Sequence, residues 1–134
     1  MNEIKERIEE ILKNYKVVAI VGLSPKKERP SRQVAQYLQK HGYKIVPVRP
    51  GMNEILGEKC YGSLSEIPFP IDVVDIFRKS EAVLPIIDEA IKIGAKSVWL
   101  QLGIKNPEAE KKAESAGLLV VSNRCMKIEH SKRY

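Results

Sequence analysis

The sequence predicts a doubly wound α/β fold, with a mainly parallel sheet of about five strands and helices on both faces. Strand-like and helix-like segments alternate along the chain. The strand-like segments are unbroken apolar runs, such as residues 17–21, which is typical of strands covered on both faces. This first run ends at Gly22, before a polar loop and a helix-like segment, and that order of elements forms an anion site.

Length and composition indicate one domain, over residues 1–134, with no membrane partner and no structural metal. No segment approaches the roughly 18 consecutive apolar residues of a membrane span, and the N-terminus lacks the basic-then-apolar order of a signal peptide. We therefore expect a cytoplasmic protein. Neither the two histidines nor Cys60 and Cys125 have metal-site spacing; reduced thiols are expected, although a bridge between them stays open.

The charge of the chain favours a small anionic ligand over nucleic acid. The formal net charge is +6, but Lys and Arg are interleaved with Glu nearly everywhere, which is typical of a solvated surface. Aromatic residues make up only 6% of the chain and are not interleaved with basic residues, so the stacking platform of a single-strand binder is missing. A basic loop, KKER at residues 26–29, lies beside the predicted anion site and suits a small nucleotide ligand.

The N-terminal part of the chain predicts a helix, a strand and a second helix. Residues 2–14 carry apolar side chains at spacings of three and four, which indicates an amphipathic helix on the flank of the domain. Residues 17–21 form the first strand. The second helix is expected to have Ser31 as its N-cap and to end near Gly42.

Residues 44–48 predict the second strand, in which Pro47 is tolerable only near the end or beside a gap in the hydrogen-bond ladder. The next segment, residues 49–68, is rich in Gly and Pro. It is expected to be a loop with a short strand at residues 59–61 and a helical turn at residues 63–66. A loop of this length in a compact domain is often functional.

The third strand is expected at residues 71–77, where the apolar run resumes. Helical spacing of apolar side chains predicts a helix over residues 80–93, with Pro85 in or near its first turn. Residues 97–100 are the fourth strand.

The C-terminal part predicts one more helix and strand and a short closing helix. Asn106 followed by Pro107 indicates an N-cap and a first helical residue, and the helix runs to Gly117. Residues 118–121 are the last strand, and residues 126–130 form the closing helix.

In a doubly wound sheet, ligands bind beyond the carboxyl ends of the strands, so the loop after the first strand is the first candidate. Gly22, Ser24, Arg29 and Ser31 lie there, but the second and third glycines of a GxGxxG dinucleotide motif are missing. The serine hydroxyls and the N–H groups of the helix start donate hydrogen bonds, and Arg29 offers a charged fork matched to phosphate oxygens. The alternative is an ordinary βα loop in which Ser31 only caps the helix.

The end of the second strand bears on which nucleotide the site takes. A NAD site places Asp or Glu there to accept hydrogen bonds from the ribose hydroxyls, whereas this chain has Val48, Arg49 and Pro50. Arg49 argues against NAD and for an extra phosphate on the ribose, as in NADP or coenzyme A. A solvated loop arginine is the alternative.

The other strand ends are predicted to line the same edge of the sheet. Phe77 and Arg78 offer an aromatic face and a cation to a nucleotide, although Phe77 would fit the core equally well. The tail of such a ligand is expected to reach the ends of the last two strands. The candidate residues there are Gln101, Gly103, Asn123, Arg124 and Cys125.

Catalytic groups are hard to find in the sequence. There is no Ser-His-acid order, and Cys125, with His130 five residues further on, is more simply a small buried or ligand-adjacent residue than a nucleophile. Asp72 and Asp75 lie three residues apart in a strand and point to opposite faces, which excludes a paired acid and base. Asp75 is expected to contact a loop or to occupy an edge position.

Several segments, in order along the chain, carry a family resemblance: VGLSPKKERPS, YKIVPVRPG, ILGEKCYGSL, VVDIFRKSE, GAKSVWLQLGI and NRCMKIEH. They resemble the small single-domain CoA-binding proteins, whose fold is similar to the CoA-binding domain of the succinyl-CoA synthetase α subunit. The match covers nearly the whole chain, from Val18 to His130. It implies a Rossmann-like domain that takes coenzyme A or an acyl-CoA.

The resemblance also implies how the ligand lies. The loop after the first strand would hold the pyrophosphate, and the segment from Pro47 to Pro50 would flank the adenosine. Phe77 and Arg78 would line the remaining path, together with the loops that contain Gln101 and Cys125.

Two positions depart from the family pattern: Arg49 stands where relatives tend to show Asn, and Asn123 replaces an expected acidic residue. The resemblance does not imply catalysis, because the synthetases use an additional domain with a phosphohistidine and a second subunit. We expect a non-catalytic binding module that acts as a carrier, a sensor or a subunit of an assembly, with a homo-oligomer or a protein partner left open. The alternatives are an NADP-dependent reductase and a thiol enzyme that uses Cys125.

Overall fold

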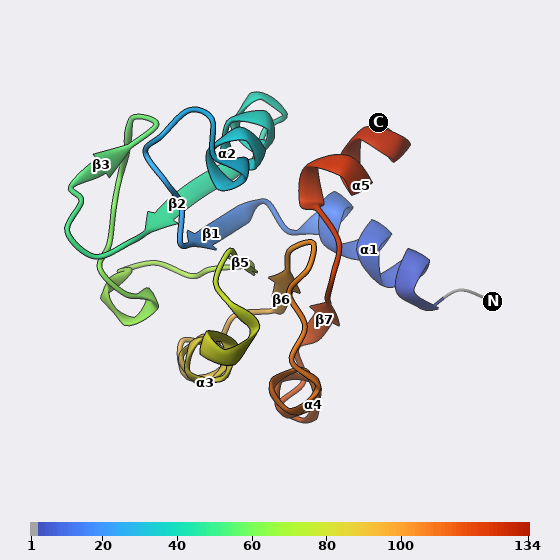
Figure 1. The fold of residues 1–134 in the computed structure, drawn as a ribbon. Helices are drawn as coiled ribbons and strands as arrows, with labels where there is room; N and C mark the ends of the chain where they lie inside the picture. The colour runs from blue at the N-terminus through green and yellow to red at the C-terminus, as the bar shows by residue number, and fades with distance from the viewer. Residues whose placement is uncertain (1–2) are drawn as a thin grey trace.

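A five-stranded parallel sheet lies at the centre of the computed structural model, which describes residues 3–134 (Figure 1). The strand order is β2-β1-β5-β6-β7, so the chain starts inside the sheet, adds one edge strand and then crosses to the other side. This is the predicted doubly wound α/β fold. The strands are β1 (Val17–Val21), β2 (Lys44–Val48), β5 (Val73–Ile76), β6 (Ser97–Leu100) and β7 (Leu119–Val121).

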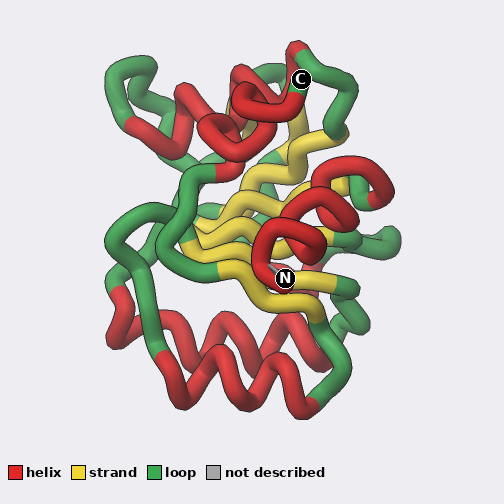
Figure 2. Tube along the Cα trace, turned by 90° about the vertical axis from the view of Figure 1, so that its right-hand side faces the viewer, coloured by secondary structure: helices red, strands yellow, loops and turns green. Residues whose placement is uncertain are grey.

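Helices cover both faces of the sheet, as Figures 1 and 2 show. Side chains alternate between the faces, so that Ile20 packs in one core and its neighbours Ala19 and Val21 pack in the other. This double coverage explains the unbroken apolar runs in the strands. On one face lie α1 (Glu3–Asn14), α2 (Pro30–Lys40) and α5 (Met126–Arg133); on the other lie α3 (Val83–Lys92) and α4 (Pro107–Ser115).

The direction of winding changes between β1 and β5, which are neighbours in the sheet. The connection after β1 runs through α2 on one face, whereas the connection after β5 runs through α3 on the other face. The two loops therefore diverge at the carboxyl ends of these strands. A crevice at this position is where open α/β sheets bind ligands.

Most predicted elements are present, with differences of a few residues at their ends. β1, β2 and β6 have the predicted bounds, and Asn106 caps α4, since its Oδ1 accepts the N–H of Ala109 at 3.1 Å. The strand predicted at 71–77 is shorter, a 3-10 turn at Ser80–Ala82 precedes α3, and α5 is longer than predicted. The predicted helix start at Asn2 lies outside the described residues. Within residues 3–134, no helix has the length and apolar character needed to cross a membrane.

The prediction that Ser31 caps α2 was wrong. Arg29 is the N-cap, with an extended backbone (φ −76°, ψ 140°), and Pro30 is the first helical residue. Proline is favoured at this position because its missing N–H would have had no acceptor in the helix. Ser31 therefore lies inside the first turn, and its hydroxyl does not cap the helix.

The long loop after β2 contains a hairpin that was not predicted. Strands β3 (Glu54–Ile55) and β4 (Glu58–Lys59) pair antiparallel, and between them Leu56 and Gly57 both have positive φ. The short strand expected at residues 59–61 is replaced by the end of β4 and by a single parallel bridge between Tyr61 and Val48. The helical turn predicted at residues 63–66 is present as a 3-10 turn at Leu64–Glu66.

The expectation for Asp75 was also wrong. β5 is the central strand of the sheet, between β1 and β6, and Asp75 pairs in register with Ile20 and Trp99. Its exposed fraction is 0%, so it is shielded from solvent, and it does not lie at an edge of the sheet. Asp72, outside the strand, accepts the N–H of Val17 at 3.1 Å.

Candidate functional site

A cavity of about 360 Å³ opens where β1 ends and α2 begins. Within it, Ser24 donates its backbone N–H to Ser31 Oγ at 3.0 Å, and Ser24 Oγ accepts the N–H of Lys26 at 3.1 Å. Both serine oxygens act as acceptors in these bonds, so both hydroxyl hydrogens stay available to a ligand. We name this the phosphate cavity; its lining residues are Gly22, Ser24, Pro25, Lys26, Arg29, Pro30, Ser31, Arg49 and Phe77.

Gly22 sets the width of the crevice between β1 and β5. Its φ is +88°, and a Cβ atom built on it would lie 2.4 Å from the carbonyl oxygen of Phe77 and 3.1 Å from Cδ of Arg78. Only a residue without a side chain allows the turn after β1 to approach the end of β5 so closely. The glycine of the predicted anion site is therefore required by geometry.

A second cavity, of about 430 Å³, lies on the side of Gly22 that faces α3 and the end of β2. It shares Gly22 and Arg49 with the phosphate cavity, so the two are adjacent. One carboxylate reaches it, that of Glu89, whose Oε2 accepts hydrogen bonds from the N–H and the hydroxyl of Ser65 at 3.1 and 2.9 Å. We name this the β2 cavity; it is lined by Val21, Gly22, Val48, Arg49, Pro50, Gly62, Ser63, Arg78, Ile86 and Glu89.

A third cavity, of about 510 Å³, lies over the ends of β5, β6 and β7. It shares Pro30 and Phe77 with the phosphate cavity. Most of its lining side chains are apolar, in contrast to the other two. We name this the apolar cavity; it is lined by Pro30, Val34, Phe77, Arg78, Lys79, Gln101, Leu102, Ile104 and Cys125.

The cations along these cavities have no carboxylate partners in the described part of the chain. Several basic residues elsewhere do, such as Arg7 with Glu114 and Lys112 with Asp88. A row of uncompensated positive charge around a crevice raises the local concentration of anions. The unpaired cations are Lys26, Arg29, Arg49, Arg78 and Lys79.

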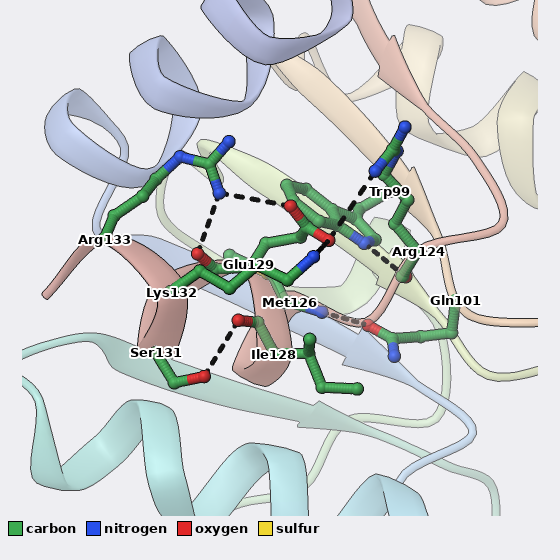
Figure 3. A network of polar contacts seen from close by, with 9 residues as sticks. All are labelled: Trp99, Gln101, Arg124, Met126, Ile128, Glu129, Ser131, Lys132 and Arg133. Atoms are coloured by element: carbon green, nitrogen blue, oxygen red, sulfur yellow. Dashed lines mark hydrogen bonds and ion pairs between the residues drawn. The ribbon is translucent and has the colours of Figure 1, made fainter.

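The ends of β6 and β7 are tied to α5 by hydrogen bonds (Figure 3). Gln101 Oε1 accepts the N–H of Met126, the first residue of α5, at 3.2 Å. Trp99 Nε1 donates to the carbonyl oxygen of Arg124 at 2.8 Å. Gln101 is 4% exposed and lines the apolar cavity, and no residue of the described chain accepts from its amide nitrogen.

The side chain of Arg124 is directed toward α5. Its Nη1 lies 3.7 Å from Oε2 of Glu129, a buried carboxylate that also pairs with Lys132 at 3.5 Å and Arg133 at 3.1 Å (Figure 3). These contacts hold the guanidinium of Arg124 beside the helix. A structural role in docking α5 therefore accounts for Arg124.

Not every residue that was predicted for the site lines a cavity. Asn123, with φ +56°, accepts the N–H of Gly103 at its Oδ1 at 2.7 Å, and so links the loops after β6 and β7. Pro47 is buried within the edge strand β2. The predicted residues that lie outside the three cavities are Pro47, Gly103, Asn123 and Arg124.

Some cavity residues were missed by sequence reasoning. Val34 belongs to the apolar stripe of α2, and Leu102 and Ile104 follow a strand without any motif. Their role depends on how α2 and the loop after β6 face each other, which no local pattern encodes. Lys26 had a signal, since it belongs to the basic KKER segment.

No catalytic pair forms at the site. His130 Nδ1 is hydrogen-bonded to the hydroxyl of Tyr37 at 2.8 Å, so its ring is engaged with α2. Burial lowers the pKa of His130, and the nearby His41 and Lys16 lower it further. Cys60 and Cys125 are both free thiols. Among residues 3–134, no group of three or more His, Cys, Asp or Glu is arranged to hold a metal ion.

The buried carboxyl of Asp75 has no hydrogen-bond partner on either oxygen. Burial raises the pKa of Asp75 well above its usual range, because the charged form loses its hydration without gaining a partner. Burial therefore shifts the balance of this group toward the neutral acid.

Comparisons with known proteins identify a family for the whole domain. A family model described as CoA binding domain matches residues 16–131. The chain is 39% identical over 130 residues to the uncharacterized protein YneT of Bacillus subtilis (strain 168), which covers 97% of this chain and 96% of that protein. The structure of a hypothetical protein from Pyrococcus horikoshii OT3 superposes with a TM-score of 0.92 and 50% identity, over 96% of this chain and 90% of that one.

Larger enzymes contain a similar part. The chain is 32% identical over 101 residues to acetate–CoA ligase (ADP-forming) II of Archaeoglobus fulgidus, which covers 74% of this chain but 15% of the ligase. The apo form of the dinucleotide forming acetyl-coenzyme A synthetase 1 of Ca. Korarchaeum cryptofilum superposes with a TM-score of 0.76 and 29% identity, over 85% of this chain and 27% of that one. Because the family model matches most of the chain and a relative matches it over nearly its full length, the chain belongs to the CoA binding domain family, as its resemblance to the CoA-binding domain of succinyl-CoA synthetase predicted.

Proposed function

We propose that this protein binds coenzyme A or an acyl-CoA and that it performs no chemistry on the ligand by itself. The observation that carries the proposal is the row of five unpaired cations along three adjacent cavities at the switch point of the sheet. Coenzyme A bears a diphosphate and a ribose 3′-phosphate on one long molecule. The negative charge of its phosphate groups matches the positive charge of the row.

The diphosphate fits the phosphate cavity. The hydroxyls of Ser24 and Ser31 have free hydrogens, and the guanidinium of Arg29 lines the same cavity. In the first turn of α2, Pro30 has no N–H, and the N–H of Arg32 donates to the carbonyl oxygen of Arg29 at 3.1 Å. The turn therefore adds the N–H of Ser31 and the positive end of the helix dipole. A doubly charged group bound here replaces the water around these donors with a fixed set of hydrogen bonds.

The adenosine end of the ligand fits the β2 cavity. Arg49 lies between this cavity and the phosphate cavity, and Arg78 lines the β2 cavity from the end of β5. A phosphate on the ribose would lie between two guanidinium groups, each able to form a forked pair with its oxygens. This geometry supports a ligand with a ribose phosphate over one without it.

The proposal of a non-catalytic role is supported by what surrounds the crevice. His130 is bonded to Tyr37, and the carboxyl of Asp75 is fully buried in the centre of the sheet. Neither group is free to exchange a proton with a bound ligand. An NADP-dependent reductase or a Cys125 thiol enzyme requires such a group beside the reacting atoms.

Isothermal titration tests the proposal with three ligands: CoA, dephospho-CoA and NADP⁺. We expect CoA to bind, dephospho-CoA to bind about tenfold more weakly because charge-assisted bonds to its 3′-phosphate are missing, and NADP⁺ to bind more weakly than CoA. Arg49→Gln should reduce the difference between CoA and dephospho-CoA. Arg32→Gln, which removes the same charge from α2 outside the three cavities, should leave it unchanged.

Each outcome bears on one part of the proposal. Absence of CoA binding would contradict the proposed function. Equal affinity for CoA and dephospho-CoA would remove Arg49 and Arg78 from recognition of the 3′-phosphate. Tighter binding of NADP⁺ than of CoA would favour the reductase alternative.

A further inference from the structure

The apolar cavity differs in character from the phosphate and β2 cavities. Phe77 and Pro30 line both this cavity and the phosphate cavity, so the pantetheine arm of a CoA ligand held by its diphosphate extends from the phosphate cavity toward the apolar cavity. Val34, Leu102 and Ile104 complete its apolar lining. No carboxylate lines it. Two cations, Arg78 and Lys79, also line the cavity, but its lining is mainly apolar and suits an uncharged part of a molecule.

Leu102 is a large apolar side chain that is 58% exposed at the rim of this cavity. It is one of three exposed large apolar residues in the described chain; the others are Ile128 on α5 and Tyr134 directly after α5, both outside the cavity. Covering Leu102 with an aliphatic chain would remove apolar surface from water on both sides of the contact. The exposed leucine and the lining of the cavity thus both favour an aliphatic chain as the ligand group that binds here.

One polar side chain that lines the same cavity has a hydrogen-bond donor without a protein acceptor in the described chain. The carbonyl oxygen of the Gln101 side chain is used by the N–H of Met126, which fixes the orientation of the amide. Its nitrogen has no acceptor in the described chain, and the residue is 4% exposed and lines the cavity. A donor fixed in an apolar cavity matches a ligand carbonyl with an apolar chain beyond it.

We propose that the apolar cavity binds the acyl end of an acyl-CoA, so that the ligand class is CoA thioesters of short, uncharged aliphatic acids. Gln101 donates to a carbonyl at this end of the ligand, and Leu102 and Ile104 cover the chain. This inference rests on the proposed CoA-binding function and extends it from the nucleotide to the acyl group. Free CoA leaves the apolar rim uncovered, so the site prefers the thioester.

The test is a series of titrations with CoA, acetyl-CoA, butyryl-CoA and succinyl-CoA. Each buried methylene tightens binding by about threefold to fourfold, so butyryl-CoA should bind roughly tenfold more tightly than acetyl-CoA. Succinyl-CoA has the same length as butyryl-CoA but ends in a carboxylate, and it should bind no more tightly than acetyl-CoA. Leu102→Ser should reduce the ratio between butyryl-CoA and acetyl-CoA to about threefold or less.

The matched control is Ile128→Ser, which makes the same kind of change on an exposed part of α5 outside the cavity. It should leave the tenfold ratio unchanged. Equal affinities for acetyl-CoA and butyryl-CoA, with CoA itself bound, would overturn this inference while the proposed function stands. Tighter binding of succinyl-CoA than of butyryl-CoA would also overturn it, because it would show that Arg78 and Lys79 bind the terminal carboxylate of the acyl group. No binding of any of the four ligands would instead contradict the proposed function.

Discussion

Gly22 joins β1 to the loop of the phosphate cavity, and its lack of a side chain allows the crevice to exist. We expect Gly22→Ala to destabilise the protein and to weaken CoA binding, because its Cβ would displace the carbonyl of Phe77. Gly42 is a matched control: its φ is also +88°, but nothing lies within 4 Å of the position of its Cβ. The left-handed backbone costs about 1–2 kcal/mol in either variant, so only Gly22→Ala should carry an additional loss.

Urea denaturation and CoA titration of both variants measure this difference. Similar stability and similar affinity in the two variants would show that the contact with Phe77 is not what requires glycine.

Asp75 leads to a second prediction about stability, because its carboxyl is buried without a hydrogen-bond partner. We expect Asp75→Val to be more stable than the natural chain at pH 7 by about 1–3 kcal/mol, the cost of an unpaired buried polar group. The folded-state pKa of Asp75 is raised above the unfolded value, so the contribution of this carboxyl to stability is greatest below the unfolded pKa of about 3.9 and is lost as pH rises toward the folded pKa. This loss is about 1.4 kcal/mol per pH unit and should vanish in the variant.

Asp75→Asn provides the control for the pH effect. It keeps the shape and the unpaired polar atoms but does not titrate, so its stability should be low and should lack this pH dependence. Chemical denaturation at several values between about pH 5 and pH 8 tests both variants. If Asp75→Val is less stable than the natural chain at pH 7, the buried carboxyl does not lower the free energy of unfolding, and this account of Asp75 is wrong.

At the same scale, the residues that sequence reasoning found are those with a distinctive chemical or backbone requirement. Gly22, Ser24, Arg29 and Arg49 follow strands at positions where a doubly wound sheet binds ligands, and they do gather around one cavity. Leu102 could not be found, because an apolar residue after a strand has many uses and its exposure is decided by tertiary packing. Buried polar residues are equally hard to place, since the sequence around Asp75 is that of any apolar strand.

Among the elements, α5 packs against the rest of the domain through a titratable side chain, His130. His130 packs against rings from several segments: its ring stacks on Tyr134 at 4.7 Å between centroids and meets Tyr37 and Tyr43 edge-on. The unfolded chain has an ordinary histidine pKa of about 6.5, whereas the folded pKa is lower. Stability is therefore lost as pH falls through about 6.5, because the unfolded chain takes up the proton first.

We expect His130→Phe to lose less stability than the natural chain between about pH 7 and pH 5, because phenylalanine keeps an aromatic ring in place without titrating. Tyr37→Phe is the control: it removes the same hydrogen bond of 2.8 Å but leaves the imidazole, so its pH dependence should persist. Thermal unfolding at several pH values gives the comparison. An unchanged pH dependence in His130→Phe would exclude His130 as its source.

The elements themselves were largely predictable, for reasons that differ between them. β1, β2 and β6 are apolar runs bounded by polar residues, so their predicted and observed bounds agree. Asn106 followed by Pro107 is typical of a helix start, and the structure has the start of α4 there. The hairpin β3–β4 was missed because its strands have only two residues each, too few to show any periodicity. Pro30 and Ser31 are both good helix starts, and the proline took the first helical position.

For the whole molecule, the positive charge matters through its location more than through its total. The net charge is +6, and the cations that lack partners gather along the crevice. We expect CoA affinity to fall several-fold between about 0.05 M and about 0.5 M NaCl, because salt screens charges that are exposed to solvent. We also expect no binding of duplex DNA at the lower salt concentration, since basic and acidic residues are interleaved over the rest of the chain.

Fluorescence anisotropy with a labelled duplex and calorimetry with CoA measure these two quantities. A CoA affinity that does not change with salt would contradict an electrostatic origin of binding. Salt-dependent binding of the duplex would show that the charge serves a nucleic acid instead.

The central claim is that the crevice between β1 and β5 holds the diphosphate of a CoA ligand, and a crystal structure of the protein with CoA tests it most directly. The account predicts diphosphate oxygens within about 3 Å of the hydroxyls of Ser24 and Ser31 and of the guanidinium of Arg29. A diphosphate bound elsewhere on the protein, with these three side chains unengaged, would contradict it.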